Sequence, residues 1–178
     1  KKYEFQILVC AIKRGEQVYI PDGNFELKAR DEISIVGTPA KTIEFFKKLG
    51  VPTSSARDAL IVGGGRTSVY LAKQLLEMGI RVKIIERDEE RCEELNEMVP
   101  KAMIICGDAT DKDLLIEEGL LETEAFVATT NFDEENIMLA LFAKSLSSAK
   151  LITKVHRISY DDIIDQLDVG SIIYPKFI

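Results

Sequence analysis

Beyond residue 58 the chain alternates short apolar runs with amphipathic stretches, and this alternation restricts the fold more than any other feature. The apolar runs are only four or five residues long, whereas helical periodicity fills the intervals between them. Buried strands that alternate with helices form parallel sheets covered on both faces. The sequence therefore predicts a doubly wound α/β domain with a six-stranded parallel sheet. The expected strands are Ala59–Val62, Arg81–Ile85, Ala102–Cys106, Ala125–Thr129, Leu151–Val155 and Ser171–Tyr174, and the expected helices are Thr67–Met78, Glu89–Met98, Asp111–Glu118, Asp133–Leu146 and Ser159–Leu167.

The first of these strands runs into a helix through a glycine-rich turn, Gly63–Gly65, which is the context of a dinucleotide-binding fingerprint. Gly63 allows a tight turn, and Gly65 allows the backbone to approach a pyrophosphate closely. The N–H groups and partial positive charge of the helix N-terminus then hold the anion. The third fingerprint position is Ser68 instead of glycine or alanine; its side chain crowds the packing of helix on strand and can donate to a phosphate. Arg66 either contacts the phosphate or is solvated.

An acidic residue ends the second expected strand: Glu86 lies 23 positions after Gly63. A carboxylate at this position accepts hydrogen bonds from the ribose hydroxyls of an adenosine. It repels a 2′-phosphate and so favours NAD over NADP, although the neighbouring Arg87 leaves NADP open. A glycine-rich turn without a ligand is the alternative, but the two elements in register favour nucleotide binding.

Two more loops follow expected strands, at the edge where open α/β sheets bind ligands. Gly107–Thr110 places Asp108 near the adenine or ribose, and Thr129–Asn131 places its polar side chains near the diphosphate or second nucleoside. The alternative role is helix N-capping, which suits Thr110, Asp111, Asn131 and Asp133. The candidate nucleotide-binding residues are Gly63, Gly64, Gly65, Arg66, Thr67, Ser68, Glu86, Arg87, Asp108, Ala109, Thr129 and Asn131.

The first 50 residues have a different, strand-rich pattern. We expect a meander followed by a short amphipathic helix, and a sheet this small is marginal unless something covers it. Gly50–Ser55 has the composition of a linker. The sequence thus predicts a partial domain over residues 1–50 and a nucleotide-binding domain over residues 51–178. The expected elements of the first are strands Phe5–Ile12, Gln17–Ile20, Phe25–Ala29 and Glu32–Val36 and helix Ala40–Leu49.

Charge and cysteine usage limit the partners and the compartment. The net charge of −7, without a basic cluster, disfavours nucleic acid as a partner. No apolar run reaches the length of a membrane span, and the N-terminus lacks a signal-peptide pattern. Three cysteines without CxxC spacing predict a reducing, cytoplasmic setting, with Cys10 and Cys106 buried as small hydrophobes.

Catalytic and metal-binding signatures are not evident in the sequence. His156 is the one histidine, and no acid–base partner is evident beside it in the sequence. No Cys/His spacing suits zinc, and the acidic clusters at Asp88–Glu90, Asp133–Glu135 and Asp161–Asp162 are more typical of helix starts and solvated faces than of a cation site. We expect neither catalysis nor a metal.

Several separate motifs follow one another in a specific order: Ile61–Arg66, Tyr70–Leu76, Ile85–Cys92, Gly107–Thr110 and Ala128–Asn136. Together they resemble the RCK (KTN) domain of the TrkA family, the regulatory subunits of potassium uptake systems. Residues 1–50 resemble the end of the companion C-terminal subdomain, in Val9–Gly15, Ile20–Gly23 and Asp31–Pro39. On that pattern the chain is a middle piece, the end of one C-subdomain followed by the next N-subdomain. Ser68 stands where the family usually has glycine.

The resemblance implies regulation instead of catalysis. Family members bind NAD, NADH or an adenine nucleotide such as ATP, ADP or AMP, and they assemble as dimers or higher rings. They gate a membrane potassium transporter or channel from the cytoplasmic face. By resemblance Gly63, Gly65, Arg66 and Glu86 bind the ligand, with Asp108 and Thr129 as further candidates. The apolar stripe of Ser159–Leu167 is a candidate subunit contact, with core packing as its alternative. An NAD-dependent oxidoreductase fragment and a scaffold with a vestigial nucleotide site are the competing functions.

Overall fold

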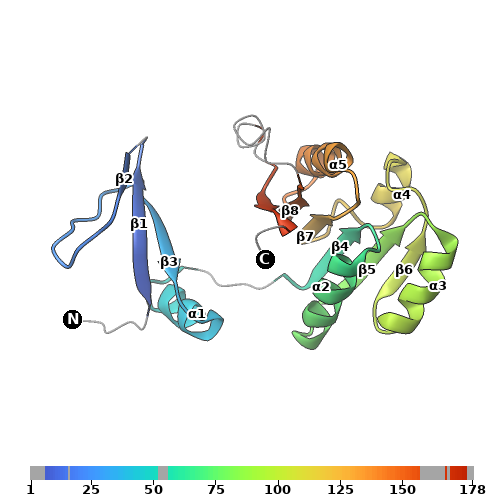
Figure 1. Ribbon diagram of the computed structural model, residues 1–178, viewed down its shortest axis with the longest axis horizontal. Coiled ribbons are helices and arrows are strands. Elements are labelled where there is room, and N and C mark those ends of the chain that lie inside the picture. Colours follow the sequence, from blue (N-terminus) through green and yellow to red (C-terminus); the bar gives the residue numbers. More distant parts are fainter. Residues whose placement is uncertain (1–6, 16, 52–55, 157–166, 168, 176–178) are drawn as a thin grey trace. The chain divides into compact units, whose positions relative to one another are not determined.

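The computed structural model describes residues 7–15, 17–51, 56–156, 167 and 169–175. The chain divides into two compact units, Lys1–Ser55 and Ala56–Ile178 (Figure 1). The first unit is a three-stranded antiparallel sheet with one helix, and the second is a six-stranded sheet with helices between its strands.

The sheet of the first unit has the order β2–β1–β3. Its central strand supplies Ile12, which pairs with Tyr19 on one side and Ile33 on the other. Ile12 is 1% exposed and is the buried apolar side chain of this unit among the described residues. Several other apolar residues of the unit, such as Ile20 at 88%, are exposed. The elements are β1 (Leu8–Arg14), β2 (Gln17–Tyr19), β3 (Glu32–Val36) and α1 (Pro39–Lys48).

The strand predicted over Phe25–Ala29 is wrong: these residues join no sheet. Side chains take up the backbone groups that a strand ladder would otherwise pair. The guanidinium of Arg14 donates to the carbonyl of Glu26 at 3.0 Å, and the carboxylate of Asp31 accepts from the N–H of Lys28 at 2.8 Å. Arg14 also pairs with Asp31 at 2.7 Å, and this hydrogen bond, with that of Lys28, lowers the pKa of Asp31 to about 2. Periodicity does not reveal such local side-chain competition.

The second unit confirms the predicted doubly wound sheet. Its order is β6–β5–β4–β7–β8–β9, and all five neighbouring pairs are parallel. The direction of winding reverses between β4 and β7, which is the topological switch point. The strands are β4 (Asp58–Val62), β5 (Arg81–Glu86), β6 (Met103–Cys106), β7 (Ala125–Ala128), β8 (Lys150–Lys154) and β9 (Ser171–Ile173); the helices are α2 (Arg66–Glu77), α3 (Glu89–Met98), α4 (Lys112–Glu117) and α5 (Asp133–Leu146).

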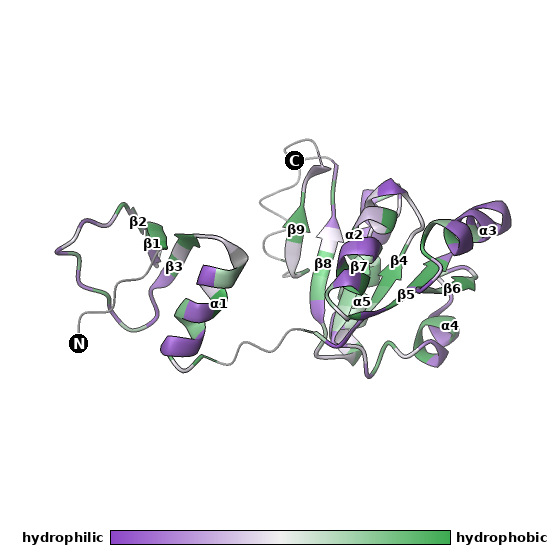
Figure 2. Ribbon diagram, turned by 90° about the horizontal axis from the view of Figure 1, so that it is seen from below, coloured by the Kyte–Doolittle hydropathy of each residue, from purple (hydrophilic) through white to green (hydrophobic). Residues whose placement is uncertain are grey.

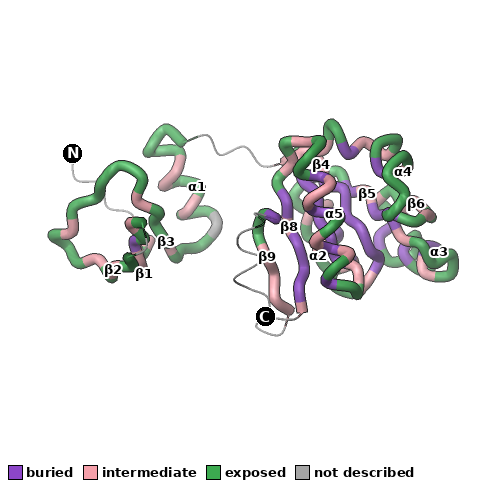
Figure 3. The backbone as a smooth tube through the Cα atoms, turned by 90° about the horizontal axis from the view of Figure 1, so that it is seen from above, coloured by how far each residue is buried: buried purple, intermediate pink, exposed green. Residues whose placement is uncertain are grey.

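Apolar side chains fill both faces of this sheet. Along β4, Leu60 and Val62 pack in a cluster with residues of α4 and α5, whereas Ile61 packs on the opposite face with residues of α2 and α3. The inner strands β4, β5, β7 and β8 are accordingly largely buried, whereas the edge strands β6 and β9 are not (Figures 2 and 3). This two-sided burial explains why the strands read as continuous apolar runs instead of alternating ones.

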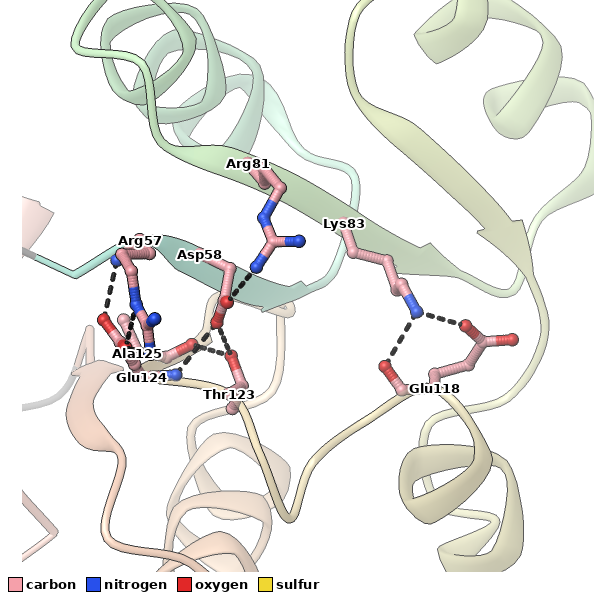
Figure 4. A network of polar contacts seen from close by, with 8 residues as sticks. All are labelled: Arg57, Asp58, Arg81, Lys83, Glu118, Thr123, Glu124 and Ala125. Atoms are coloured by element: carbon pink, nitrogen blue, oxygen red, sulfur yellow. Dashed lines mark hydrogen bonds and ion pairs between the residues drawn. The ribbon is translucent and has the colours of Figure 1, made fainter.

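A polar network closes the edge of the sheet at which β4 and β5 begin (Figure 4). The carboxylate of Asp58 accepts from the N–H of Glu124 at 3.0 Å and from Arg81 at 2.9 Å. Nearby, the ammonium of Lys83 donates to the carbonyl and the carboxylate of Glu118 at 2.8 and 2.7 Å. These bonds fix the segment between α4 and β7 against the amino ends of the central strands. The opposite edge is where the loops after the strands remain available.

The cysteine expectation is only partly met. Cys106 is exposed, contrary to prediction, and Cys10 is partly buried, whereas Cys92 is the buried thiol. Cys106 ends β6, which is the edge strand of the sheet, so an apolar run there does not ensure burial.

The predicted helix Ser159–Leu167 lies outside the described residues except for Leu167, which is helical and 39% exposed. The candidate subunit contact through the apolar stripe of this helix therefore stays a prediction. Among the described residues no helix is both long and apolar enough to cross a membrane.

Candidate functional site

The loops that follow β4, β5, β6 and β7 meet at the carboxyl edge of the sheet, around the switch point. They enclose a cleft of about 270 Å³. Nine of the twelve candidate residues line it, whereas Arg66, Thr67 and Ser68 do not. The lining is Val62, Gly63, Gly64, Gly65, Ile85, Glu86, Arg87, Asp88, Gly107, Asp108, Ala109, Thr129, Thr130, Asn131, Phe132 and Glu135.

The three glycines of the first loop differ in what requires them. Gly63 has φ +94°, and a Cβ there would lie 2.9 Å from the backbone nitrogen of Thr130. A Cβ on Gly64 would lie 2.5 Å from a methyl group of Leu95. At Gly65, in contrast, a Cβ would meet no atom within 4 Å, and the backbone is extended at φ −69°. The backbone therefore requires glycine at position 63, and the side chains of Leu95 and Glu86 would have to shift to admit a Cβ at position 64. The open space at Gly65 suits the approach of a ligand.

Helix α2 begins beside this open space. Its N-cap is Gly65, which offers no side chain to the free N–H groups of the first turn, so these groups remain available to an anion. Arg66 and Thr67 are exposed on the outside of that turn. From the other side, Arg91 donates to the carbonyl of Gly64 at 2.8 Å and fixes the loop. This role was not predicted from the sequence, because Arg91 was noted there only as part of the Ile85–Cys92 motif.

Ser68 does not line the cleft. The side chain of Ser68 is fully buried, and its hydroxyl lies 2.9 Å from the hydroxyl of Thr129. The Thr129 hydroxyl in turn donates to the carbonyl of Val62 at 2.9 Å. The hydroxyl that replaces the usual glycine thus links α2 to the end of β7. No buried side-chain polar atom lacks a partner among the described residues.

Glu86 lies across the mouth of the glycine loop. One carboxylate oxygen accepts from the N–H of Gly64 at 2.6 Å, and the other accepts from the N–H groups of Arg87 and Asp88 at 2.8 and 3.0 Å. A carboxylate offers about four acceptor positions. A single ribose hydroxyl can therefore join the three N–H groups, and a second would share or displace the contact to Gly64.

Arg87 and Phe132 face each other across the cleft, with the guanidinium 5.8 Å from the ring centroid. Phe132 is 53% exposed, and sequence reasoning missed it. The only signal was an aromatic residue in a polar loop after a strand. On the β6 side, the N–H and hydroxyl of Thr110 lower the pKa of Asp108, and the charge of Arg87 lowers it further. The cleft thus has a flat cationic group beside a flat aromatic one.

The capping predictions for the two helices after β6 and β7 have different outcomes. Asp111 is the N-cap of α4 and accepts from the N–H of Asp113, as expected. For α5 the N-cap is Phe132, without a side-chain bond, so the prediction of Asn131 or Asp133 as the cap is wrong. Asp133 instead accepts from both the backbone and the ring of His156 at 2.9 Å. His156, beside which the sequence showed no acid–base partner, thus has the Asp133 carboxylate against its ring.

Comparison with known proteins identifies the two units. Residues 59–175 match the TrkA-N domain, and residues 2–50 match the TrkA-C domain. The Trk system potassium uptake protein TrkA of Vibrio alginolyticus is 36% identical over 168 residues, which is 94% of this chain and 36% of that protein. A TrkA homologue of Methanosarcina mazei is 32% identical over 170 residues, 95% of this chain and 42% of that protein. The chain therefore spans about two fifths of the length of these relatives.

Solved structures show the same fold at lower identity. The TrkA-N domain of the inner membrane protein ybaL from Escherichia coli is 20% identical with a TM-score of 0.61, over 70% of this chain and 92% of that one. The GsuK channel bound to NAD is 18% identical with a TM-score of 0.66, over 96% of this chain and 30% of that one. TrkA and RCK domains form a regulatory, non-catalytic family. With a TrkA-C domain followed by a TrkA-N domain, the chain belongs to the TrkA family.

Proposed function

We propose that this chain is a cytosolic regulatory module of a potassium uptake or transport system. It binds NAD or NADH, with ATP, ADP or AMP as alternatives, in the cleft at the carboxyl edge of its parallel sheet. It acts in a homo-oligomer on the inner face of the membrane and gates a transporter or channel subunit by conformational change. The names of its TrkA relatives and the GsuK channel bound to NAD support this assignment.

The geometry at Gly65 carries the proposal. The chain itself does not need a glycine there, because a Cβ would meet no atom within 4 Å. A phosphate seated on the first turn of α2 would use that space, and Glu86 lies next to it for a ribose. The expected preference for NAD over NADP rests on the Glu86 carboxylate, which repels a 2′-phosphate.

The position of the cleft supports a gating role. Its walls come from β4, β5 and β6 on one side of the switch point and from β7 on the other. At Gly63 the two sides are in backbone contact, since a Cβ there would lie 3.0 Å from the carbonyl of Thr129. A ligand that touches both sides shifts a conformational equilibrium only if it binds one arrangement more tightly. Different affinities for two arrangements would couple the ligand to the membrane partner.

Calorimetric titration with NAD, NADH, ATP, ADP, AMP and NADP tests the proposal. We expect micromolar binding, strongest for NAD or NADH and weakest for NADP, that Gly65→Asp abolishes by placing a carboxylate where the phosphate would lie. Gly23→Asp is the matched control, because a Cβ there also meets no atom within 4 Å but belongs to the first unit. Absence of binding to the unaltered chain would instead support the vestigial scaffold.

The oxidoreductase alternative predicts turnover of a dinucleotide with a small substrate. His156 is the sole histidine of the chain, and its ring contacts Asp133. We expect no absorbance change at the reduced-nicotinamide band when NAD is mixed with the chain and small alcohols or hydroxy acids. Steady turnover above a protein-free blank would overturn the regulatory assignment.

A further inference from the structure

The cleft has an unfavourable charge for an anionic ligand. Among the described residues that line it, Glu86, Asp88, Asp108 and Glu135 carry carboxylates, and Arg87 carries the one guanidinium. The N-terminus of α2 adds only about half a positive charge. A further positive charge near the loop, beside those of Arg66 and Arg91, would favour a nucleotide phosphate at Gly65.

Lys154 is a buried cationic residue beside the β7 loop of the cleft. It ends β8, is 5% exposed, and its ammonium donates to the carbonyl of Thr129 at 2.9 Å. Among the described residues, no ion pair joins it to a carboxylate. Burial lowers the pKa of Lys154, while the charge of Asp133 raises it.

Lys154 and Asn136 make hydrogen bonds to the backbone of Thr129, Thr130 and Lys154 itself. The carbonyl of Thr129 accepts from Lys154, and the N–H of Thr130 donates to the side chain of Asn136 at 2.8 Å. The amide of Asn136 donates in turn to the carbonyl of Lys154 at 3.0 Å. The peptide between Thr129 and Thr130 thus has no N–H left to donate to an anion. This side of the cleft can therefore attract an anion only through the charge of the Lys154 ammonium, which lies behind that peptide.

Two consecutive contacts locate the charge relative to the glycine loop. The ammonium of Lys154 is 2.9 Å from the carbonyl oxygen of Thr129, and that oxygen is 3.0 Å from the Cβ position at Gly63. The ammonium therefore lies within about 6 Å of the loop, separated from it by one peptide group. A charge acting through a poorly solvated layer of this thickness retains a strong interaction.

We propose that Lys154 is a positioning and specificity-determining residue of the nucleotide cleft, which holds the β7 loop by its hydrogen bond and selects phosphate-bearing ligands by its charge. The inference rests on the proposed function. It makes the affinity of the site for a nucleotide depend on a residue that touches neither ligand nor solvent.

A ligand series graded in charge tests the inference on the full chain. Calorimetry with adenosine, AMP, ADP and NAD is compared for the unaltered chain, Lys154→Met, Lys154→Gln and Lys154→Arg. We expect Lys154→Met and Lys154→Gln to weaken the binding of ADP about tenfold and the binding of adenosine less than about twofold. The binding of AMP and NAD should be weakened less than that of ADP. Lys154→Arg keeps the charge and should restore most of the ADP affinity. Lys154→Gln keeps a donor for the Thr129 carbonyl, so it carries the test if the methionine variant does not fold.

Lys83→Met is the matched control, because Lys83 is a partly buried lysine on β5 whose ammonium lies at the opposite edge of the sheet (Figure 4). It removes the same charge and should leave the ranking of the four ligands unchanged. Equal weakening of adenosine and ADP by the Lys154 variants would show a purely structural role and overturn the inference, as would no change for any ligand. Absence of binding by the unaltered chain would reject the proposed function itself, and the inference with it.

Discussion

At the scale of single residues, the site combines positions required by the fold with positions left open. Gly63 is needed because its φ is positive and a Cβ would collide with backbone atoms, and a Cβ at Gly64 would press on the Leu95 side chain, whereas Gly65 borders free space. The motif predicted that these glycines form the loop, but it does not distinguish their roles, since the distinction depends on Leu95 and Thr130 from distant segments. Phe132 and Arg91 were missed for the same reason: their neighbours come from other loops.

The glycine distinction predicts that the same substitution has a large effect on stability at Gly63 and almost none at Gly65. Gly63→Ala should lower the free energy of unfolding by about 2 kcal/mol or more, because it forces a positive φ and a contact of 2.9 Å. Gly65→Ala should change it by less than about 0.5 kcal/mol, since the weaker N-cap and the reduced entropy of the unfolded chain offset each other. Urea unfolding measures both. A similar loss of stability in the two variants would contradict the distinction.

The facing pair of Arg87 and Phe132 predicts base stacking. The chain contains no tryptophan, so Phe132→Trp introduces a single reporter into the cleft. We expect saturable quenching of its fluorescence by adenine nucleotides, with a midpoint equal to the calorimetric dissociation constant. Phe142→Trp, which lies on α5 outside the cleft lining, should not respond. Binding seen by calorimetry without a change at position 132 would rule out stacking there.

At the scale of elements, apolar runs predicted the strands of the parallel sheet to within about two residues at each end. These strands are buried on both faces, so hydrophobicity alone identifies them. The first unit was harder, because its sheet is mostly exposed and Phe25–Ala29 has strand composition without a partner. The predicted helix starts agree with the structure to within about one residue, including Asp133 for α5. The capping residue was predicted at α4, where Asp111 caps the helix, and not at α5, where Phe132 is the N-cap without a side-chain bond.

The network at the amino edge predicts a pH dependence of stability. Burial raises the pKa of Asp58, but hydrogen bonds from Glu124, Thr123 and Arg81 outweigh it and leave the pKa below 3.8. A carboxyl with a lowered pKa in the folded state stabilises above its unfolded pKa, and that stability is lost as the pH falls through the folded value. Asp58→Asn should therefore cost about 1–2 kcal/mol at pH 7, with the difference shrinking below pH 3.8.

Urea unfolding between pH 7 and pH 2.5 measures this difference. Glu117→Gln, at an exposed carboxylate on α4, is the control and should change stability by less than about 0.5 kcal/mol throughout. A deficit of Asp58→Asn that stayed constant down to the lowest pH would refute the role of the ionised carboxylate.

At the scale of the whole molecule, the two units differ in the size of their hydrophobic cores. The second has two large apolar clusters, one on each face of its sheet. The first buries only Ile12 among its described apolar residues. The doubly wound architecture follows from this pattern of burial and was predicted, whereas the placement of side chains in the cleft required the fold itself.

We expect residues 56–178 expressed alone to unfold in one cooperative thermal transition, close to that of the second unit in the full chain. Residues 1–55 alone should show no cooperative transition, because so small a sheet with one buried apolar side chain cannot offset its conformational entropy. Circular dichroism of both fragments provides the measurement. A sharp transition in the shorter fragment would show that this sheet is stable without any covering partner.

The hydroxyl pair behind the cleft also constrains the order in which sequences of this kind can diverge. Thr129 keeps the carbonyl of Val62 as a partner when Ser68 becomes glycine, so that exchange leaves no buried hydroxyl stranded. The reverse order is costly, because Thr129→Val first would leave the fully buried hydroxyl of Ser68 without its acceptor. A glycine–valine pair is therefore reached at lower cost when the serine is replaced before the threonine.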